Sequence, residues 1–270
     1  MKRYAMSRTN SRSDSADHNL DQTGQHYMID KKLVRFIVDS AVLKADDVVL
    51  EIGYGHGALT KELIKKSNVI AIDIEKRELN LRSDKLELLQ GNILELYDAI
   101  KADYKFNKIV ANIPYNISEP LFRKLFKTDF ELCILTIGEN FADLLKRKDN
   151  RIGMLADALL QINILCMVPK KAFRPQPKIQ SAVVSITKKH AGMLDDVGKI
   201  FRDLLYLDDK KLKNALEKII DNESSLKNYT KKQLSEIIIK HKMEKTCAKK
   251  FYELKNEEFL EFEKFLKKIS

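Results

Sequence analysis

The stretch from Val48 to Gly57 constrains the fold of this chain more than any other. It reads VVLEIGYGHG, an apolar run followed by glycines at positions 53, 55 and 57. A continuous apolar run of this length is typical of a strand buried on both faces of a parallel sheet. Glycines directly after such a strand let the backbone turn sharply and approach a ligand closely. The stretch therefore predicts an α/β fold with a ligand site at the carboxyl end of this strand.

The chain up to residue 188 continues this pattern. Short apolar runs alternate with amphipathic stretches such as the candidate helices over residues 31–42, 58–66 and 119–127. The predicted strands cover residues 48–52, 69–74, 86–90, 108–112, 132–137, 164–168 and 182–186. This alternation predicts a doubly wound, Rossmann-like sheet with helices on both faces. A loop alone separates the last two strands, so we expect them to form an antiparallel hairpin at the edge of the sheet.

Three regions differ in composition. Residues 1–22 are polar and predict a disordered arm, residues 23–188 form the predicted sheet domain, and residues 189–270 contain only helical patterns. The net charge of the chain is +10, and residues 188–270 hold 20 Lys and Arg against 15 Asp and Glu, about half of that excess. Basic surfaces favour polyanions, because each neutralised phosphate releases a counterion. We therefore expect residues 189–270 to form a basic helical domain that binds nucleic acid.

The composition also argues against several classes of protein. No run approaches the roughly 18 apolar residues of a membrane span, and the first residues lack the apolar core of a secretory signal. Cys133, Cys166 and Cys247 lie far apart and show neither metal-ligand nor disulfide spacing. We expect a cytoplasmic monomer that needs neither a metal nor a membrane.

Side chains at the ends of the first three predicted strands suit a nucleoside cofactor with a cationic part. Glu51 would repel phosphates beside the glycine loop but suits a positive group. Asp73 ends the second strand, where a carboxylate can accept hydrogen bonds from both hydroxyls of a ribose. Asn92 follows the third strand and has a side-chain carbonyl that can accept a hydrogen bond, but no charge. No Lys-Ser/Thr pair follows the glycines, which excludes a P-loop and leaves S-adenosylmethionine as the best fit. A similar fold that binds another ligand is the alternative.

The tetrapeptide Asn112-Ile113-Pro114-Tyr115 follows the fourth strand and is the most specific signal in the chain. The Asn112 side-chain carbonyl and the Ile113 backbone carbonyl can each accept one N–H of an aromatic amine and so aim its lone pair at a methyl donor. Pro114 fixes the turn and removes a competing donor. Tyr115 can stack on a flipped base, which contributes about 1–3 kcal/mol. Transfer from a sulfonium needs no strong base, so catalysis would rest mostly on proximity and orientation.

From about residue 24 to residue 188 the chain resembles the small-subunit ribosomal RNA adenine N6-dimethyltransferase family, and the similarity is weaker in the helical tail. The similar motifs are Gly24-Gln25-His26-Tyr27-Met28, the stretch Glu51 to Thr60, the stretch Asn112 to Ser118, and the stretch Phe173 to Val184. The resemblance implies methyl transfer from S-adenosylmethionine to two adjacent adenosines near the 3′ end of small-subunit RNA. The substrate would be that RNA or an assembling small ribosomal subunit.

The resemblance also implies roles for single residues. The cofactor would be bound by Gln25, His26, Met28, Glu51, Gly53, Gly55, Asp73, Asn92 and Asn112. Phe173 would be a second aromatic side chain near the flipped adenine. The chain departs from the family at Asn92, where Asp is usual, at residues 137–140, and at Asp208 and Asp209, where a basic pair is usual.

Two other functions stay open on these residues. Erythromycin-resistance methylases modify large-subunit RNA with the same Asn-x-Pro-Tyr motif, although the Ser181-Ala182-Val183-Val184 segment and the long helical tail favour the small-subunit branch. A related scaffold could instead bind nucleic acid without catalysis, as a transcription or assembly factor. The departures from the family favour that second alternative, and the intact motif at residues 112–115 argues against it.

Overall fold

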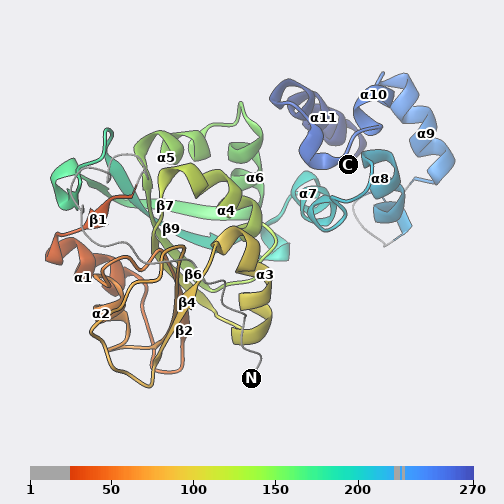
Figure 1. The fold of residues 1–270 in the computed structure, drawn as a ribbon. Helices are drawn as coiled ribbons and strands as arrows, with labels where there is room; N and C mark the ends of the chain where they lie inside the picture. Colours follow the sequence, from red (N-terminus) through yellow and green to blue (C-terminus); the bar gives the residue numbers. More distant parts are fainter. Residues whose placement is uncertain (1–24, 222–225, 227–228) are drawn as a thin grey trace, which may run out of the picture.

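The computed structural model describes residues 25–221, 226 and 229–270, so the arm predicted over residues 1–22 lies outside the described residues. A seven-stranded sheet runs through the N-terminal part of the chain (Figure 1). Its strands are β2 (Val48–Ile52), β3 (Asn68–Asp73), β4 (Leu86–Gln90), β5 (Lys108–Asn112), β6 (Leu132–Gly138), β7 (Leu160–Val168) and β9 (Ser181–Lys188). Their order is β4-β3-β2-β5-β6-β9-β7. The five strands from β4 to β6 in this order are parallel, as the sequence predicts.

The last two strands form the expected antiparallel hairpin at one edge of the sheet. Strand β9 pairs antiparallel with both β6 and β7, which leaves β7 as the edge strand. Strand β7 begins at Leu160, earlier than predicted, because Gln161 and Asn163 interrupt the apolar run there. An edge strand tolerates this pattern, since one of its sides is open to solvent.

The sheet separates two hydrophobic cores. Leu50 and Ile52 face one core, whereas Val49 faces the other, as alternation along a strand requires. The first core contains residues of α3 (Ile93–Tyr104), α4 (Ser118–Leu125), α5 (Glu139–Lys146) and α6 (Arg151–Leu159). The second contains residues of α1 (Lys31–Ser40) and α2 (Thr60–Leu63). Helices on both faces confirm the predicted Rossmann-like, doubly wound α/β architecture.

Two local features differ from the sequence prediction. Helix α2 is shorter than the predicted helix over residues 58–66, because Leu59 offers no side-chain cap and a turn from Leu63 to Lys66 closes the other end. The two-residue strands β1 (Tyr27–Met28) and β8 (Phe173–Arg174) pair with each other and were not predicted. Strands this short carry no periodic signal in the sequence.

After β9 the described chain is helical. The helices are α7 (Asp196–Tyr206), α8 (Leu212–Asp221), α9 (Lys231–Lys240), α10 (Glu244–Cys247) and α11 (Asn256–Ile269), drawn in blue in Figure 1. Within the region predicted to contain only helical patterns, one segment forms no more than the single 3₁₀ turn Phe251–Glu253. Phe201, Phe251 and Phe259 pack ring against ring at the centre of this bundle. They belong to the same hydrophobic core as the α3–α6 face of the sheet, so the bundle and the sheet share buried surface.

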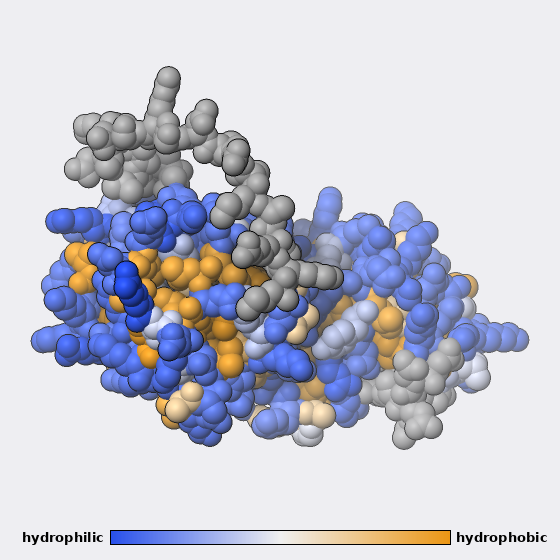
Figure 2. Space-filling model, turned by 60° about the horizontal axis from the view of Figure 1, so that its bottom comes forward, coloured by the Kyte–Doolittle hydropathy of each residue, from blue (hydrophilic) through white to orange (hydrophobic). Residues whose placement is uncertain are grey.

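The face of the molecule drawn in Figure 2 is mostly hydrophilic, and its broadest hydrophobic area lies on the part that contains the sheet. Within the described ranges, the longest helices are either too short or too polar to span a bilayer.

Candidate active site

A cavity opens where the parallel strands end. It is lined by residues that precede α1, follow β2, β3 and β4, and end β5, because parallel strands bring their carboxyl ends to one edge of the sheet. The lining residues are Gln25, His26, Tyr27, Ile52, Gly53, Gly55, Ile72, Asp73, Ile74, Gly91, Asn92, Ile93, Asn112, Ile113, Pro114, Tyr115, Asn116 and Ile117. Gly53 and Gly55 of the glycine loop lie 57 residues or more before Asn112 in the sequence, yet they line the same cavity as the Asn-Ile-Pro-Tyr motif.

One wall of the cavity is the strap, which we define as residues Gln25–Met28. Its Tyr27 and Met28 pair with β8, and the His26 carbonyl accepts a hydrogen bond from Asn112 Nδ2 at 2.9 Å. The Tyr27 ring lies 4.5 Å from the His56 ring, centroid to centroid. The strap therefore reaches from the glycine loop to the Asn-Ile-Pro-Tyr motif.

The loop after β2, which contains Gly53, Gly55 and Gly57, adopts a backbone conformation that favours glycine. Gly53, Gly55 and Gly57 all adopt positive φ angles, between 50° and 75°, which other residues adopt only with strain. A Cβ atom on Gly55 would also lie 2.9 Å from Cδ1 of Tyr27. The loop backbone therefore approaches the strap more closely than any side chain would allow.

Asp73 is held in the cavity wall by backbone donors. Its Oδ2 accepts a hydrogen bond from Gly55 N at 2.9 Å, and its Oδ1 accepts one from Glu75 N at 3.0 Å. The side chain is almost buried, with 8% of its surface exposed. Each carboxylate oxygen keeps a further lone pair, so two hydroxyl groups can still donate to it.

The apolar part of the cavity was missed by the sequence reasoning. Ile74 is 61% exposed and lines the cavity directly after Asp73, with Ile72 and Ile93 nearby in the lining. From sequence alone, an isoleucine at the end of a predicted strand is expected to be buried in the core. Only the fold shows that Ile74 is exposed in the cavity, where a flat ring can pack against it.

Asn92 lies in the cavity wall and also begins a helix. Its Oδ1 accepts a hydrogen bond from Leu94 N at 3.0 Å, and its Nδ2 donates to Glu95 Oε1 at 2.9 Å. Asn and Asp are both good residues for capping a helix N-terminus. The departure from the usual Asp therefore preserves the cap of α3 while it removes a negative charge from the cavity.

Asn112 is oriented by the strap. Because its Nδ2 donates to the His26 carbonyl, the opposite end of the amide is the carbonyl oxygen. Ile113 and Pro114 follow in the cavity lining, and Pro114 precedes a single 3₁₀ turn over Tyr115–Ile117. The motif thus presents acceptors at the end of β5 with little freedom to rotate.

Tyr115 is held in place at both its ring and its hydroxyl. Its OH lies 2.7 Å from Oγ of the fully buried Ser181, and burial raises the pKa of the phenol, which stays neutral. A Cβ on Gly138 would lie 3.4 Å from the Tyr115 ring. Gly138, noted in the sequence only as part of a departure from the family, thus leaves room for this ring.

Three predicted site residues do not line the cavity. Met28 and Phe173 are opposite each other in the β1–β8 pair and pack into the core beside α1, where they are 7% and 2% exposed. Glu51 is 1% exposed and lies within β2. The pairing of β8 with the strap turns the Phe173 side chain into the core in this structure, and its role near a flipped adenine stays a prediction.

Among the residues that the structure describes, no three His, Cys, Asp or Glu side chains form a group able to hold a metal ion. The cavity instead offers a carboxylate, amides, backbone groups and apolar side chains. Together with the strand order, this site defines the class: the fold is that of a Rossmann-like methyltransferase.

Comparison with known proteins shows which family of methyltransferases this chain belongs to. The sequence matches the ribosomal RNA adenine dimethylase family over residues 17–258. It is 36% identical over 211 residues to a protein of Methanopyrus kandleri described as probable ribosomal RNA small subunit methyltransferase A, an alignment that covers 72% of this chain and 74% of the relative. A protein of Pyrococcus furiosus with the same description is 32% identical over 92% of both chains. The chain belongs to the ribosomal RNA adenine dimethylase family.

Solved structures agree with this family. The crystal structure of a dimethyladenosine transferase from Plasmodium falciparum has a TM-score of 0.57 and 26% identity, and the match covers 87% of this chain and 95% of that one. The 23S rRNA methyltransferase ErmE has a TM-score of 0.52 over 89% of this chain and 99% of its own, but only 17% identity. The likeness to ErmE concerns the fold alone.

Proposed function

We propose that this chain transfers methyl groups from S-adenosylmethionine to the N6 amines of two adjacent adenosines near the 3′ end of small-subunit ribosomal RNA. The observation that carries the proposal is that Asn112, oriented by the strap, lines the same cavity as Gly53, Gly55 and Asp73. One cavity therefore contains both a cofactor-type cradle and acceptors for an aromatic amine.

The residues of the cavity fit the cofactor. Asp73 is placed to accept hydrogen bonds from the ribose hydroxyls, and the loop at Gly53 and Gly55 lets the amino-acid part approach the backbone. Ile74 offers a surface for the adenine ring, and Asn92 borders the same space. Bound there, S-adenosylmethionine supplies an electrophilic methyl group on a cationic sulfur.

The protein's own part in the reaction is to bind and orient the target base. The side-chain oxygen of Asn112 and the backbone oxygen of Ile113 accept the two N–H groups of the adenine amine, which directs the nitrogen lone pair toward the methyl group. Tyr115 stacks on the base, and Pro114 fixes the turn. Orientation of this kind lowers the barrier without a strong base. The amine proton is lost after transfer and passes to water.

The substrate follows from the family and from the charge of the chain. The relatives named above are described as small-subunit methyltransferases, which supports the small subunit over the large-subunit substrate of the ErmE type. We propose further that residues 189–270 form a helical domain that binds ribosomal RNA or the assembling subunit, and that the protein acts as a monomer in the cytoplasm. The intact cavity argues against a purely non-catalytic binding role.

A transfer assay with mapped products tests the proposal. Incubation of undermethylated small subunits with the protein and labelled S-adenosylmethionine should place label on two adjacent adenosines near the 3′ end of the RNA, as read by primer extension. Label on large-subunit RNA would identify the alternative substrate. Tight RNA binding without any label would leave only the non-catalytic function.

The role of Tyr115 has its own test. Tyr115→Ala should slow transfer at least tenfold and leave cofactor binding nearly unchanged, because stacking on a base contributes about 1–3 kcal/mol. Tyr115→Phe retains the ring and loses only the contact with Ser181, so it should retain most of the rate. Single-turnover rates and equilibrium cofactor binding separate the two effects. An equal loss of both in Tyr115→Ala would rule out the stacking role.

A further inference from the structure

We propose that Arg77 is a positioning residue that fastens the strap over the glycine loop and thereby sets the affinity of the cavity for its cofactor. This inference rests on the proposed function, because it concerns the same cavity. Arg77 itself is not among the residues that line the cavity. It acts through Gln25 and Tyr27, which are.

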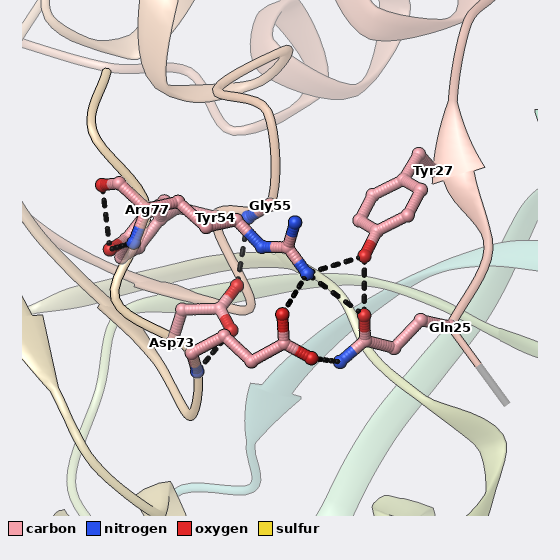
Figure 3. Close-up of polar contacts among 7 residues, drawn as sticks. Gln25, Tyr27, Tyr54, Gly55, Asp73 and Arg77 are labelled. Atoms are coloured by element: carbon pink, nitrogen blue, oxygen red, sulfur yellow. Dashed lines mark hydrogen bonds and ion pairs between the residues drawn. The ribbon is translucent and has the colours of Figure 1, made fainter. Parts of the chain in front are cut away.

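The Arg77 guanidinium is the centre of a polar cluster that includes side chains of the strap (Figure 3). Its Nη2 lies 2.7 Å from the hydroxyl of Tyr27 and 3.1 Å from Oε1 of Gln25, both in the strap. The same nitrogen lies 2.5 Å from Oε2 of Glu75, two residues after Asp73 in the chain. Gln25 Nε2 in turn donates to Glu75 Oε1 at 3.3 Å. The Arg77 side chain thus connects the strap with the segment that follows β3.

The Tyr27 ring lies between this guanidinium and the glycine loop. The Arg77 Cζ atom is 5.2 Å from the centroid of the Tyr27 ring, a distance at which a cation attracts an aromatic face. Tyr27 also contacts the position where a Cβ of Gly55 would be, and its ring packs near His56. A displacement of Arg77 would therefore release the ring from the loop.

The backbone of Arg77 is itself attached to the glycine loop. Tyr54, which is 4% exposed, accepts a hydrogen bond from Arg77 N at 3.2 Å and donates one to Arg77 O at 3.3 Å. The Arg77 side chain is 21% exposed, so its contacts are partly shielded from water. The hydrogen bonds with Tyr54 therefore fix the guanidinium relative to the glycine loop. The contacts of the guanidinium with Gln25 and Tyr27 in turn fix the strap.

Alternate residues of the strap are fastened to different parts of the molecule. The His26 carbonyl accepts a hydrogen bond from Asn112 Nδ2, and the His26 ring lies 3.0 Å from the Pro175 carbonyl through Nδ1. The side chains of Gln25 and Tyr27 instead meet at Arg77, although the Tyr27 backbone also pairs with β8. Loss of Arg77 should loosen the Gln25 and Tyr27 side chains while His26 and the acceptors for the target base keep their places.

We expect the loss of Arg77 to weaken cofactor binding without slowing the methyl-transfer step. Arg77→Ala should raise the Kd for S-adenosylmethionine tenfold or more, measured by equilibrium dialysis, and leave kcat at saturating cofactor within threefold of the wild type. Arg77→Lys retains a charge but lacks the planar fork that reaches several acceptors at once, so it should restore the affinity only in part. Hydrogen exchange of a peptide that contains residues 26–28 should become faster in Arg77→Ala.

Arg147→Ala is the matched control. Arg147 forms a 2.5 Å ion pair with Asp149, two residues away, just as Arg77 does with Glu75, but its side-chain hydrogen bonds go to Asp149 and to no residue of the strap. This variant should bind the cofactor as the wild type does. A Kd for Arg77→Ala within threefold of the wild type would overturn the inference, as would a tenfold loss of affinity without faster exchange in the strap. If the wild-type protein itself fails to bind S-adenosylmethionine, the proposed function fails instead.

Discussion

Glu51 is a carboxyl group with almost no access to water. It is 1% exposed, and its Oε2 has no hydrogen-bond partner among the described residues. Desolvation by burial raises its pKa to about 8, and the nearby negative charge of Asp73 adds to the shift. Glu51 is therefore protonated at neutral pH in the folded protein. The sequence reasoning assigned it a charged contact with the cofactor, which does not agree with this burial.

This burial predicts a pH dependence of stability. The folded state holds the Glu51 proton up to about pH 8, whereas the unfolded chain releases it near pH 4.5. The contribution of Glu51 to the free energy of unfolding is therefore fully present below pH 4.5 and declines as the pH rises to about 8. Glu51→Gln should remove this decline, as measured by urea unfolding at pH 5 and pH 8.

Glu131→Gln is the control for that experiment, because Glu131 is exposed. Its unfolding free energy should follow the wild-type pH profile. Parallel profiles for Glu51→Gln and the wild type would mean that Glu51 is not protonated in the folded state.

At the scale of elements, the strap and the glycine loop depend on a close approach at Gly55. Gly55→Ala places a Cβ within 2.9 Å of the Tyr27 ring at a φ of 50°. We expect this variant to displace the strap and to raise the Kd for S-adenosylmethionine severalfold, with a cost of about 1 kcal/mol in stability from the positive φ. Equilibrium binding and thermal unfolding measure the two effects.

Gly192→Ala is the control for Gly55→Ala. A Cβ on Gly192 would meet nothing within 4 Å, so Gly192→Ala should change neither cofactor binding nor stability appreciably. If Gly55→Ala binds the cofactor as tightly as Gly192→Ala, the strap is able to move without loss of affinity.

At the scale of the whole molecule, charged side chains attach the C-terminal helices to the sheet. Asp208 forms an ion pair with Lys127, which follows α4, and Asp209 pairs with the neighbouring Lys210. The two acids that depart from the family's basic pair are thus engaged by lysines. Asp208 has a structural role in the contact between the two parts of the chain.

Arg151 makes the least exposed of these connections. Its Nη1 donates to the carbonyls of Tyr252 and Leu254 at 3.1 and 3.0 Å, and its side chain is 14% exposed. Arg151→Ala leaves both carbonyls without this donor, so we expect the free energy of unfolding to fall by about 2–3 kcal/mol. The 61% exposed Arg147 offers the comparison, since an exposed ion pair contributes little and Arg147→Ala should leave the free energy of unfolding nearly unchanged. Urea unfolding of both variants measures the difference, and equal costs would contradict the assigned role of Arg151.

The sequence by itself determined the architecture and the two halves of the site. An apolar run that ends in glycines, and another that ends in Asn-Ile-Pro-Tyr, are local patterns. Parallel strands must bring their carboxyl ends to one edge, so Asp73 and Asn112 were predictable as neighbours. The loop connection between the last two strands likewise predicted their antiparallel hairpin at an edge of the sheet.

Only the tertiary structure decided which side chains complete the cavity and which turn away from it. The pairing of β1 with β8 joins residues far apart in the chain and directs Phe173 into the core. Arg77 meets Gln25 and Tyr27 across about fifty residues, and Gly138 leaves room for Tyr115 from a neighbouring strand. Such contacts depend on distances between elements, which hydrophobic periodicity does not encode. They arise only when the two faces of the sheet are packed.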